Sequence, residues 1–474
     1  MPTSTVTVSS IVIGQFGPMT WCMDTSEETE TSILEHPQAQ VLLADATISP
    51  DSVRGCERRL TRFMQRYLPR FYRQEQRENA VTVMEGLLSG LERKTCEPIA
   101  REHGVHRKPI QFFVGAGKWD DEAVMAELRQ HVKEDLADEQ AVLVVDGSAF
   151  AKKGNDSCGV KRQWCGRLGK LENCQVGLLL CYAGMKGHAP LDRQLYLPED
   201  WAQDSKRRQK CHVPEEVVFQ EKWRIGMDLL DRCRGELPHG WVAADDEFGR
   251  CSEFRGELRR RREPYVLDVP CNTLVRDLEG RRPPRRRGTR QGRQREMPFV
   301  RVEAWAAKQP AWRWQRLVVR AGAKGPLMVE VMTTRVRAKD QQRRVGAEER
   351  LLVVRSVEKA PRLSYCLCHA HSPVPLAELV RVHGERHQVE QMLEEGKGEA
   401  GLDHYEVRSW VGWHHHMTLS LLALWFLVRE KGHVGGKITC RHGLADPGDL
   451  LAPSACPAAQ RPTDRRGSQR RAPP

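Results

Sequence analysis

The sequence predicts an α/β protein whose mixed β-sheet core is preceded by a helical domain and interrupted by a β-rich insertion. Three observations support this prediction. Strand and helix patterns alternate over residues 139–270, strand patterns fill residues 271–375, and helical periodicity returns over residues 376–431. The chain has 474 residues, of which 40% are hydrophobic. Because single cores stop growing near about 250–300 residues, we expect about two or three domains.

Two segments precede the sheet. Residues 1–50 show no sustained periodicity, and we expect them to be poorly ordered. Residues 51–138 have helical periodicity and a basic composition, and the part from Leu91 to Asp120 resembles a helix-turn-helix with Arg107 and Lys108 at its second helix. This segment is a candidate DNA-binding domain; a purely structural helical domain is the alternative, because many small helical domains share the pattern.

The sheet core begins at residue 139. The apolar run AVLVVDGSAF reaches Asp146 and then a turn, as expected of a buried strand that delivers its last residue to a site. VKRQWCG, CQVGLLLCYA and APLDRQLYLP predict further strands, and Pro214 to Gly235 predicts a helix. GWVAADDEFG is a second strand that ends in acid, and a basic helix and the strand YVLDVP follow. The order of three strands, helix, strand, helix, strand is that of a ribonuclease H-like fold.

Residues 271–375 predict a basic, β-rich insertion. Its first part, RRPPRRRGTRQGRQRE, combines Pro, Gly and many Arg residues and is typical of a loop. Beyond it, WRWQRLVVRAG, PLMVEVMTTRV and RLLVVRSVEKA alternate like antiparallel strands. For Arg285, Arg286 and Arg287 the alternatives are a solvated loop and nonspecific contact with phosphate. We favour phosphate contact, which salt would weaken steeply.

Trp312 and Trp314 alternate with Arg313 and Arg316 on the first of these predicted strands. One interpretation is that the Trp rings stack on an extruded base while the Arg side chains grip the nucleic-acid backbone. The other is that the rings pack into the core of the insertion, since alternation sends both of them to the same face of a strand. The sequence leaves both interpretations open.

Residues 376–431 return the chain to the core as two helices. The second, roughly His404 to Glu430, carries the apolar run LSLLALWFLV, which is too short to span a bilayer and is expected to be buried. Residues 432–474 are rich in Gly, Pro, Ala and Arg without periodicity, so we expect a disordered tail, whose composition also resembles a reading frame that has shifted.

The first of these helices contains HGERHQVEQMLEEGKGEAG. His383, Arg386, Glu390, Glu394 and Lys397 fall on one stripe of it, beside an apolar stripe. One interpretation is a solvated face held by two ion pairs, Arg386 with Glu390 and Glu394 with Lys397, each contributing only about 0.2–0.5 kcal/mol. The other is a working face directed at a site.

Charge and cysteine usage indicate the partner and the compartment. The net charge is +12 and the pI is about 9.1, with Arg supplying most of the excess, so a polyanionic partner is expected. No apolar run reaches the ~18–20 residues of a membrane span, and from the composition of the amino terminus we expect no signal peptide. Fifteen scattered Cys residues fit reduced thiols and a cytoplasmic protein. CLCHAH, Cys366 to His371, looks like a metal motif, but neighbours on a strand point to opposite faces, so we favour packing over zinc.

Three acids mark a candidate metal site: Asp146, Asp245 or its neighbour Asp246, and Glu390. In a ribonuclease H-like sheet the first and fourth strands are adjacent, and a helix after the fifth strand can lie beside them. The carboxylates would then converge, and divalent cations would relieve their repulsion. Oxygen ligands suit Mg²⁺ or Mn²⁺, and two such ions can drive an in-line phosphoryl transfer.

The motifs resemble those of a known family. The spacing His383-x2-Arg386-x3-Glu390-x6-Lys397 is similar to the Y-x2-R-x3-E-x6-K signature of DDE-type bacterial insertion-sequence transposases of the insertion-sequence-four superfamily, with His in place of Tyr. DGS at Asp146 and D-x-x-F-G at Asp245 resemble the aspartate motifs of that group, and the latter register selects Asp245. GVKRQWCGRLGKLENCQVG and GLDHYEVRSWVGWHHHMTLSLLALWFL resemble its 701 branch.

The resemblance implies a transposase that cuts the ends of an insertion element and joins the 3′-hydroxyl strand to target DNA, as a homodimer on double-stranded DNA. It implies Asp146, Asp245 and Glu390 as catalytic metal ligands for about two Mg²⁺ or Mn²⁺ ions. Arg386, Lys397 and the substituted His383 would contact DNA phosphate. Two alternatives remain: an inactive relic that only binds DNA, and a basic RNA-binding or scaffolding protein to which the acids are irrelevant.

Overall fold

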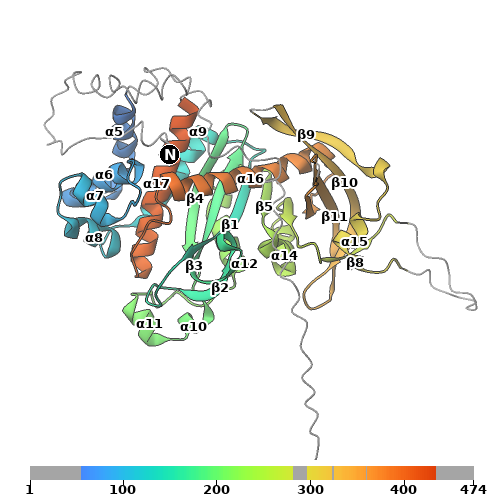
Figure 1. Cartoon of the computed structure of the whole chain (residues 1–474), viewed down its shortest axis with the longest axis horizontal. Coiled ribbons are helices and arrows are strands. Elements are labelled where there is room, and N and C mark those ends of the chain that lie inside the picture. Colours follow the sequence, from blue (N-terminus) through green and yellow to red (C-terminus); the bar gives the residue numbers. More distant parts are fainter. Residues whose placement is uncertain (1–54, 281–295, 323–324, 359, 434–474) are drawn as a thin grey trace, which may run out of the picture.

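The computed structural model describes residues 55–280, 296–322, 325–358 and 360–433. The segment 1–50, the loop with Arg285, Arg286 and Arg287, and residues 434–474 of the expected tail lie outside the described residues. Figure 1 shows a helical group at one end of the molecule and a strand-rich part at the other, with the long helix α16 (Leu376–Glu399) running between them.

The helical group follows the expected periodicity. Its helices are α5 (Cys56–Tyr67), α6 (Gln74–Leu88), α7 (Cys96–Glu102), α8 (Arg107–Gly115) and α9 (Asp121–Leu136), with a short 3₁₀ turn, η1 (Leu68–Arg70). On α5 the residues at helical spacing, Leu60, Phe63 and Met64, are buried as one face. Gly104 adopts a left-handed φ of 63° between α7 and α8, so the chain turns there as the helix-turn-helix pattern predicts.

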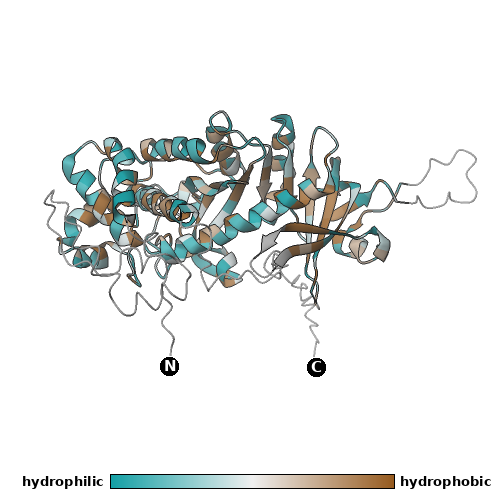
Figure 2. Cartoon of the chain, turned by 90° about the horizontal axis from the view of Figure 1, so that it is seen from above, coloured by the Kyte–Doolittle hydropathy of each residue, from teal (hydrophilic) through white to brown (hydrophobic). Residues whose placement is uncertain are grey.

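A mixed sheet forms the core. Its strands are β1 (Val142–Ala151), β2 (Lys161–Cys165), β3 (Lys170–Gly184), β4 (Gly187–Leu195), β5 (Trp241–Ala244) and β6 (Tyr265–Asp268). The order is β4-β3-β1-β5-β6, in which β1, β5 and β6 are parallel and β3 is antiparallel to its neighbours. This arrangement is consistent with the ribonuclease H-like fold. In Figure 2 the strands are largely hydrophobic and the helices beside them carry hydrophilic outer faces.

Helices connect the strands of this core. Between β4 and β5 lie α10 (Glu199–Ala202), α11 (Ser205–Lys210) and α12 (Lys222–Arg234), and between β5 and β6 lie α13 (Asp246–Gly249) and α14 (Ser252–Arg260). The prediction that α12 begins at Pro214 was wrong. The Arg208 guanidinium donates to the carbonyl oxygens of Pro214 and Val217 at 2.8 and 2.7 Å, so these carbonyls are satisfied outside a helix.

The strand-rich part continues the same sheet. It comprises β7 (Leu274–Asp277), β8 (Val300–Arg301), α15 (Val302–Ala306), the 3₁₀ turn η3 (Ala311–Arg313), β9 (Gln315–Gly322), β10 (Gly325–Lys339), β11 (Val345–Ser356) and β12 (Leu363–His369). β12 pairs antiparallel with β6, and β11, β10, β7 and β8 follow in that order. β9 pairs with the first half of β10, on the same side of that strand as β7. A second hydrophobic cluster, which includes Val275, Trp305 and Leu367, fills this part.

A buried carboxylate fastens the strand-rich part to the core. Glu349 of β11 is 3% exposed, and its Oε1 accepts from Arg255 Nε of α14 at 2.9 Å and from the Tyr265 hydroxyl of β6 at 2.5 Å. Arg259 Nη1 reaches the same oxygen at 3.1 Å. Because a buried carboxylate without such partners would be strongly unfavourable, these contacts fix β11 relative to β6.

Two long helices, α16 and α17 (Trp410–His433), are the last elements of the described chain. α16 packs across β1, β3, β5 and β6 and reaches β9 (Figure 1). It begins at Leu376, before the stripe of charges. α17 packs on β4 and on α6, α8 and α9, and its Leu-rich run is buried as expected. It begins six residues later than predicted, because Gly401 turns with a left-handed φ of 62° and the chain continues irregularly to Ser409. In the described part of the chain, helices with the length and apolarity for a membrane span are absent.

Candidate functional site

Two acidic residues leave adjacent parallel strands at the same edge of the sheet. Val145 of β1 is paired with Ala244, the last residue of β5, so Asp146 and Asp245 follow paired residues. The turn expected after Asp146 was wrong, because β1 stays paired with β3 and continues to Ala151. Asp245 also caps α13, since its Oδ1 accepts from the backbone N–H groups of Glu247 at 3.0 Å and Phe248 at 3.4 Å. The parallel pairing therefore brings together residues that lie far apart in the sequence.

The D-x-x-F-G motif has a packing reason for its glycine. A Cβ added to Gly249 would lie 1.7 Å from the carbonyl oxygen of Asp268, the last residue of β6. Only glycine allows α13 to approach β6 this closely. The motif thus fixes Asp245 and Asp268 against one another where β5 and β6 end.

Helix α16 brings Glu390 and Arg386 to this edge. The Arg386 guanidinium forms an ion pair with Glu390 through Nη1 and with Asp268 Oδ2 through Nη2, the latter at 2.9 Å. His387 Nδ1 lies 3.6 Å from the second Glu390 oxygen. The helix register therefore places a carboxylate, a guanidinium and an imidazole next to the strand ends.

The pKa shifts indicate a crowded acidic site. Burial, together with the charge of Glu390, raises the pKa of Asp146 from 3.8 to about 6. Burial and the charge of Asp146 raise the pKa of Asp245 well above its usual range. Burial also opposes ionisation of Glu390, but Arg386 and His387 together outweigh it and lower the pKa of Glu390 below its usual value. The ionised forms of Asp146 and Asp245 are therefore disfavoured, whereas Glu390 is already paired with a cation.

Lys397 lies two turns beyond Glu390 on α16 and faces the same site. Its side chain is largely buried, and its Nζ lies 2.5 Å from Glu394 Oε1. The positive charges of Arg386 and Lys397 both act to lower the pKa of Asp146, against the larger effects of burial and Glu390. The structure thus groups Asp146, Asp245, Glu390, Arg386 and Lys397, which the sequence analysis selected together.

His383, selected as a phosphate contact, lies beneath this group. It is 5% exposed, and its Nδ1 faces Asp268 Oδ1 at 3.4 Å and Cys366 Sγ at 3.6 Å. Asp246, the alternative second acid, is held by Arg250 at 2.9 Å.

Trp312 and Trp314 do not alternate on a strand, so that expectation was wrong. Trp312 lies in the turn η3 and β9 begins only at Gln315, because Pro310 precedes the turn and the Arg313 guanidinium donates to Thr333 O at 3.2 Å. Trp312 is 82% exposed. Trp314 packs on the second hydrophobic cluster with the Arg355 guanidinium 3.9 Å above its ring. The two rings therefore have different surroundings.

Sequence reasoning missed Asp268 and His387. Asp268 carried a usable signal, because YVLDVP is a third apolar run that reaches an acid, like those of Asp146 and Asp245. The burial of Asp268 opposes ionisation, but Arg386 and His383 outweigh it and hold its pKa well below the usual range. His387 had no signal of its own, since it lies off the stripe that contains Glu390.

Comparison with known proteins identifies a family to which the chain is similar. Residues 66–326 match the family model described as DDE superfamily endonuclease, which is more than half of the chain. The chain belongs to this superfamily. The matched residues include Asp146, Asp245 and Asp268, and α16 lies beyond them.

A curated relative points the same way. The chain is 27% identical over 170 residues to a protein described as a probable transposase for insertion sequence element IS701, from Microchaete diplosiphon. The similarity covers 34% of this chain and 44% of that relative, so it spans less than half of the relative's length. Together the two findings confirm the resemblance to DDE-type transposases of the 701 branch that the sequence motifs indicated.

Proposed function

We propose that this chain is a DNA transposase that cleaves the ends of an insertion element and transfers the freed 3′-hydroxyl strand to target DNA. One observation carries the proposal: Asp146, Asp245 and Glu390 gather at one edge of the sheet in a member of an endonuclease superfamily. Three carboxylates from two strands and a helix suit phosphoryl transfer, in which positioning and charge stabilisation supply most of the catalysis.

The donor set supports Mg²⁺ or Mn²⁺ as cofactor, with about two ions. Asp146 and Asp245 are recessed carboxylates, and among the described residues neither has a Lys or Arg ion pair within 4.0 Å. The raised pKa values of both mark negative charge that a cation would stabilise. When bound, such ions would activate a water or a 3′-hydroxyl and stabilise the leaving oxygen. We choose Asp245 over Asp246 because Arg250 already neutralises Asp246.

The chain's own cations would then hold the substrate. Arg386 orients the Glu390 carboxylate and is itself held by Asp268, so its position is fixed before DNA arrives. Lys397 brings a second positive charge to the side of the site where Asp146 lies. Both side chains suit a phosphate next to the scissile bond. We assign His383 to holding Asp268, since its Nδ1 faces Asp268 Oδ1 at 3.4 Å.

Other surfaces would bind the rest of the DNA. Trp312 is the exposed ring that suits stacking on a displaced base, whereas Arg355 covers the ring of Trp314. Arg285, Arg286 and Arg287 would contact the backbone without sequence preference. Helices α7 and α8 would read part of the element end, and two copies of the chain would hold the two ends.

Cleavage of DNA that carries the element's own ends tests the proposal. We expect the wild-type protein to cut with Mg²⁺ and not with EDTA, and Glu390→Gln to bind the ends without cutting them. Glu394→Gln is the matched control, since Glu394 lies one turn further on the same helix with its side chain 63% exposed. Cutting by Glu390→Gln at the wild-type rate would refute the assignment.

An inactive relic that only binds DNA is the second candidate, and His383 in place of the signature Tyr motivates it. Nicking of a supercoiled plasmid with Mg²⁺ separates the two. Specific binding of the ends, together with no nicking by the wild-type protein, would favour the relic.

A further inference from the structure

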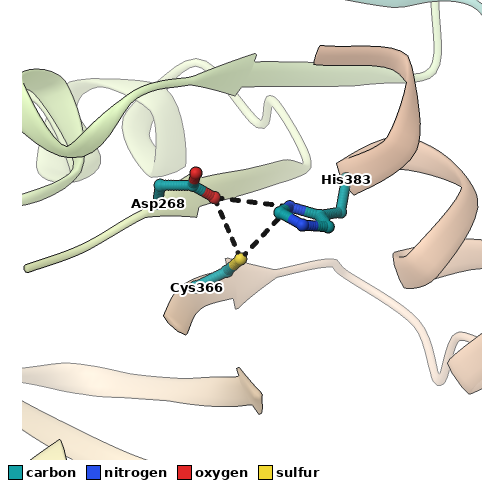
Figure 3. Close-up of side chains that lie close together, drawn as sticks. All are labelled: Asp268, Cys366 and His383. Carbon is teal, nitrogen blue, oxygen red and sulfur yellow. Dashed lines mark hydrogen bonds and ion pairs between the residues drawn. The ribbon is translucent and has the colours of Figure 1, made fainter. Parts of the chain in front are cut away.

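Three side chains from three elements lie next to one another, and one of them belongs to the charged stripe of α16. They are Asp268 at the end of β6, Cys366 in β12 and His383 in α16 (Figure 3). Their ligand atoms all lie within 4.8 Å of one another. Asp268 lies 98 positions before Cys366, and His383 lies 17 positions after it, so the fold brings the three residues together.

The spacing of their atoms matches tetrahedral zinc coordination. A tetrahedral ion with Zn–S near 2.3 Å, Zn–N near 2.0 Å and Zn–O near 2.0 Å requires S···N and S···O of about 3.5 Å and N···O of about 3.3 Å. In the structure, Cys366 Sγ lies 3.6 Å from His383 Nδ1 and 3.1 Å from Asp268 Oδ1, and His383 Nδ1 lies 3.4 Å from that oxygen. An ion can therefore enter with only small movements of the side chains.

The chemistry of the donors selects the metal. A thiolate and an imidazole favour Zn²⁺ over Mg²⁺ or Ca²⁺, which bind oxygen ligands. The two oxygens of Asp268 have different roles. Oδ1 faces Cys366 and His383 and is available to the metal, whereas Oδ2 accepts from Arg386 at 2.9 Å. A hydrogen-bonded carboxylate ligand of this kind is typical of zinc sites.

We propose that Asp268, Cys366 and His383 bind a structural Zn²⁺ ion, with water as the fourth ligand. On binding, the Cys366 thiol releases its proton to solvent and becomes a thiolate. The ion would link β12 of the strand-rich part, β6 of the core and α16, the helix that carries Glu390. His383 lies two turns before Glu390 on α16, so the ion would fix the register of the catalytic helix against the sheet.

The sequence motif CLCHAH gives a matched control. Cys366 and Cys368 are both buried on the same face of β12, two residues apart, but only Cys366 belongs to the group of three. Cys368→Ser therefore makes the same change of atom in the same strand without removing a proposed ligand. His383→Tyr removes the nitrogen ligand and restores the residue of the transposase signature.

Metal content of the purified full-length chain tests the proposal. After dialysis in zinc-free buffer with Mg²⁺, we expect about one zinc ion per chain in the wild-type protein and in Cys368→Ser, and loss of most of it in Cys366→Ser and His383→Tyr. Replacement of zinc by Co²⁺ should give a thiolate charge-transfer band in the wild-type protein and not in Cys366→Ser.

The following results would refute the proposed zinc site or its ligands. A wild-type protein that holds no zinc and gives no cobalt–thiolate band refutes the site, and this result requires no variant to fold. Equal loss of zinc from Cys368→Ser also refutes the assignment to these three residues. Asp146→Asn should keep its zinc, because the proposed Mg²⁺ ligands are separate, so failure of DNA cleavage and failure of the zinc site are distinguishable.

Discussion

Replacing Asp146 with Asn is expected to stabilise the metal-free protein at pH 8 and to abolish DNA cleavage. The pKa of Asp146 is raised from 3.8 to about 6 by burial and by Glu390, so the ionised carboxylate is unfavourable in the folded state. At about 1.4 kcal/mol per pH unit, that difference corresponds to roughly 3 kcal/mol. Because the side chain is partly exposed, solvent screening should reduce the gain to about 1–2 kcal/mol. Asn is neutral and nearly isosteric, so it removes the repulsion and keeps the shape.

The effect has a defined dependence on pH. A carboxyl whose pKa is raised on folding contributes stability that is fully present below the unfolded pKa of 3.8 and is lost as the pH rises through about 6. The free energies of unfolding of the wild-type protein and Asp146→Asn should therefore converge near pH 4. They should separate between pH 4 and 6, and the variant should stay more stable above that window.

Urea unfolding in EDTA across this pH range measures the difference, and addition of Mg²⁺ provides a second test. Mg²⁺ should stabilise the wild-type protein and leave Asp146→Asn almost unchanged, since the variant lacks a proposed ligand. Asp156→Asn is the control, because Asp156 is an exposed carboxylate that pairs with Lys210 at the surface. A variant that is less stable than wild type at pH 8 in EDTA, or an equal gain from Mg²⁺ in both proteins, would refute the reasoning.

Three further predictions follow from particular contacts. Gly249→Ala should destabilise the protein by about 2 kcal/mol or more in urea unfolding and impair cleavage, because its Cβ would meet the carbonyl at the end of β6. Glu349→Ala should reduce the free energy of unfolding by about 3–5 kcal/mol, since it leaves buried guanidinium groups uncompensated, whereas Glu348→Ala at the exposed neighbour should change it by about 0–1 kcal/mol. Trp312→Ala should leave stability within about 0.5 kcal/mol of wild type and weaken binding of element ends by roughly 5- to 150-fold. Trp314→Ala should mainly lower stability, and the reverse pattern in calorimetry and binding assays would overturn the distinction.

The two aspartates of the site, Asp146 and Asp245, were predictable from the sequence because strand burial and acidity are both local. Asp146 and Asp245 each follow an apolar run, and the parallel pairing of β1 with β5 then places them together. Asp268 has the same pattern, yet its importance depends on Arg386, which approaches from a helix more than one hundred residues later. A pattern within one strand cannot identify a partner that only the tertiary fold supplies.

Local signals also failed where side chains redirect the backbone. The segment after Pro214 has helical periodicity, but the Arg208 guanidinium takes up its carbonyl groups and α12 begins only at Lys222. Trp312 follows an alternating pattern, but Pro310 starts a turn there. In both segments a contact with a residue outside the predicted element decides the conformation.

The charged stripe of α16 illustrates how tertiary structure separates two interpretations that the sequence left open. Both ion pairs of the solvated interpretation are present, Arg386 with Glu390 and Lys397 with Glu394. On a solvated face each would contribute about 0.2–0.5 kcal/mol, but Arg386 is 11% exposed and also pairs with Asp268. Burying a guanidinium among carboxylates is often no more stabilising than packing apolar residues of similar size. A protein selected only for stability gains little from this arrangement, so its presence beside Asp146 favours a role in binding charged substrate.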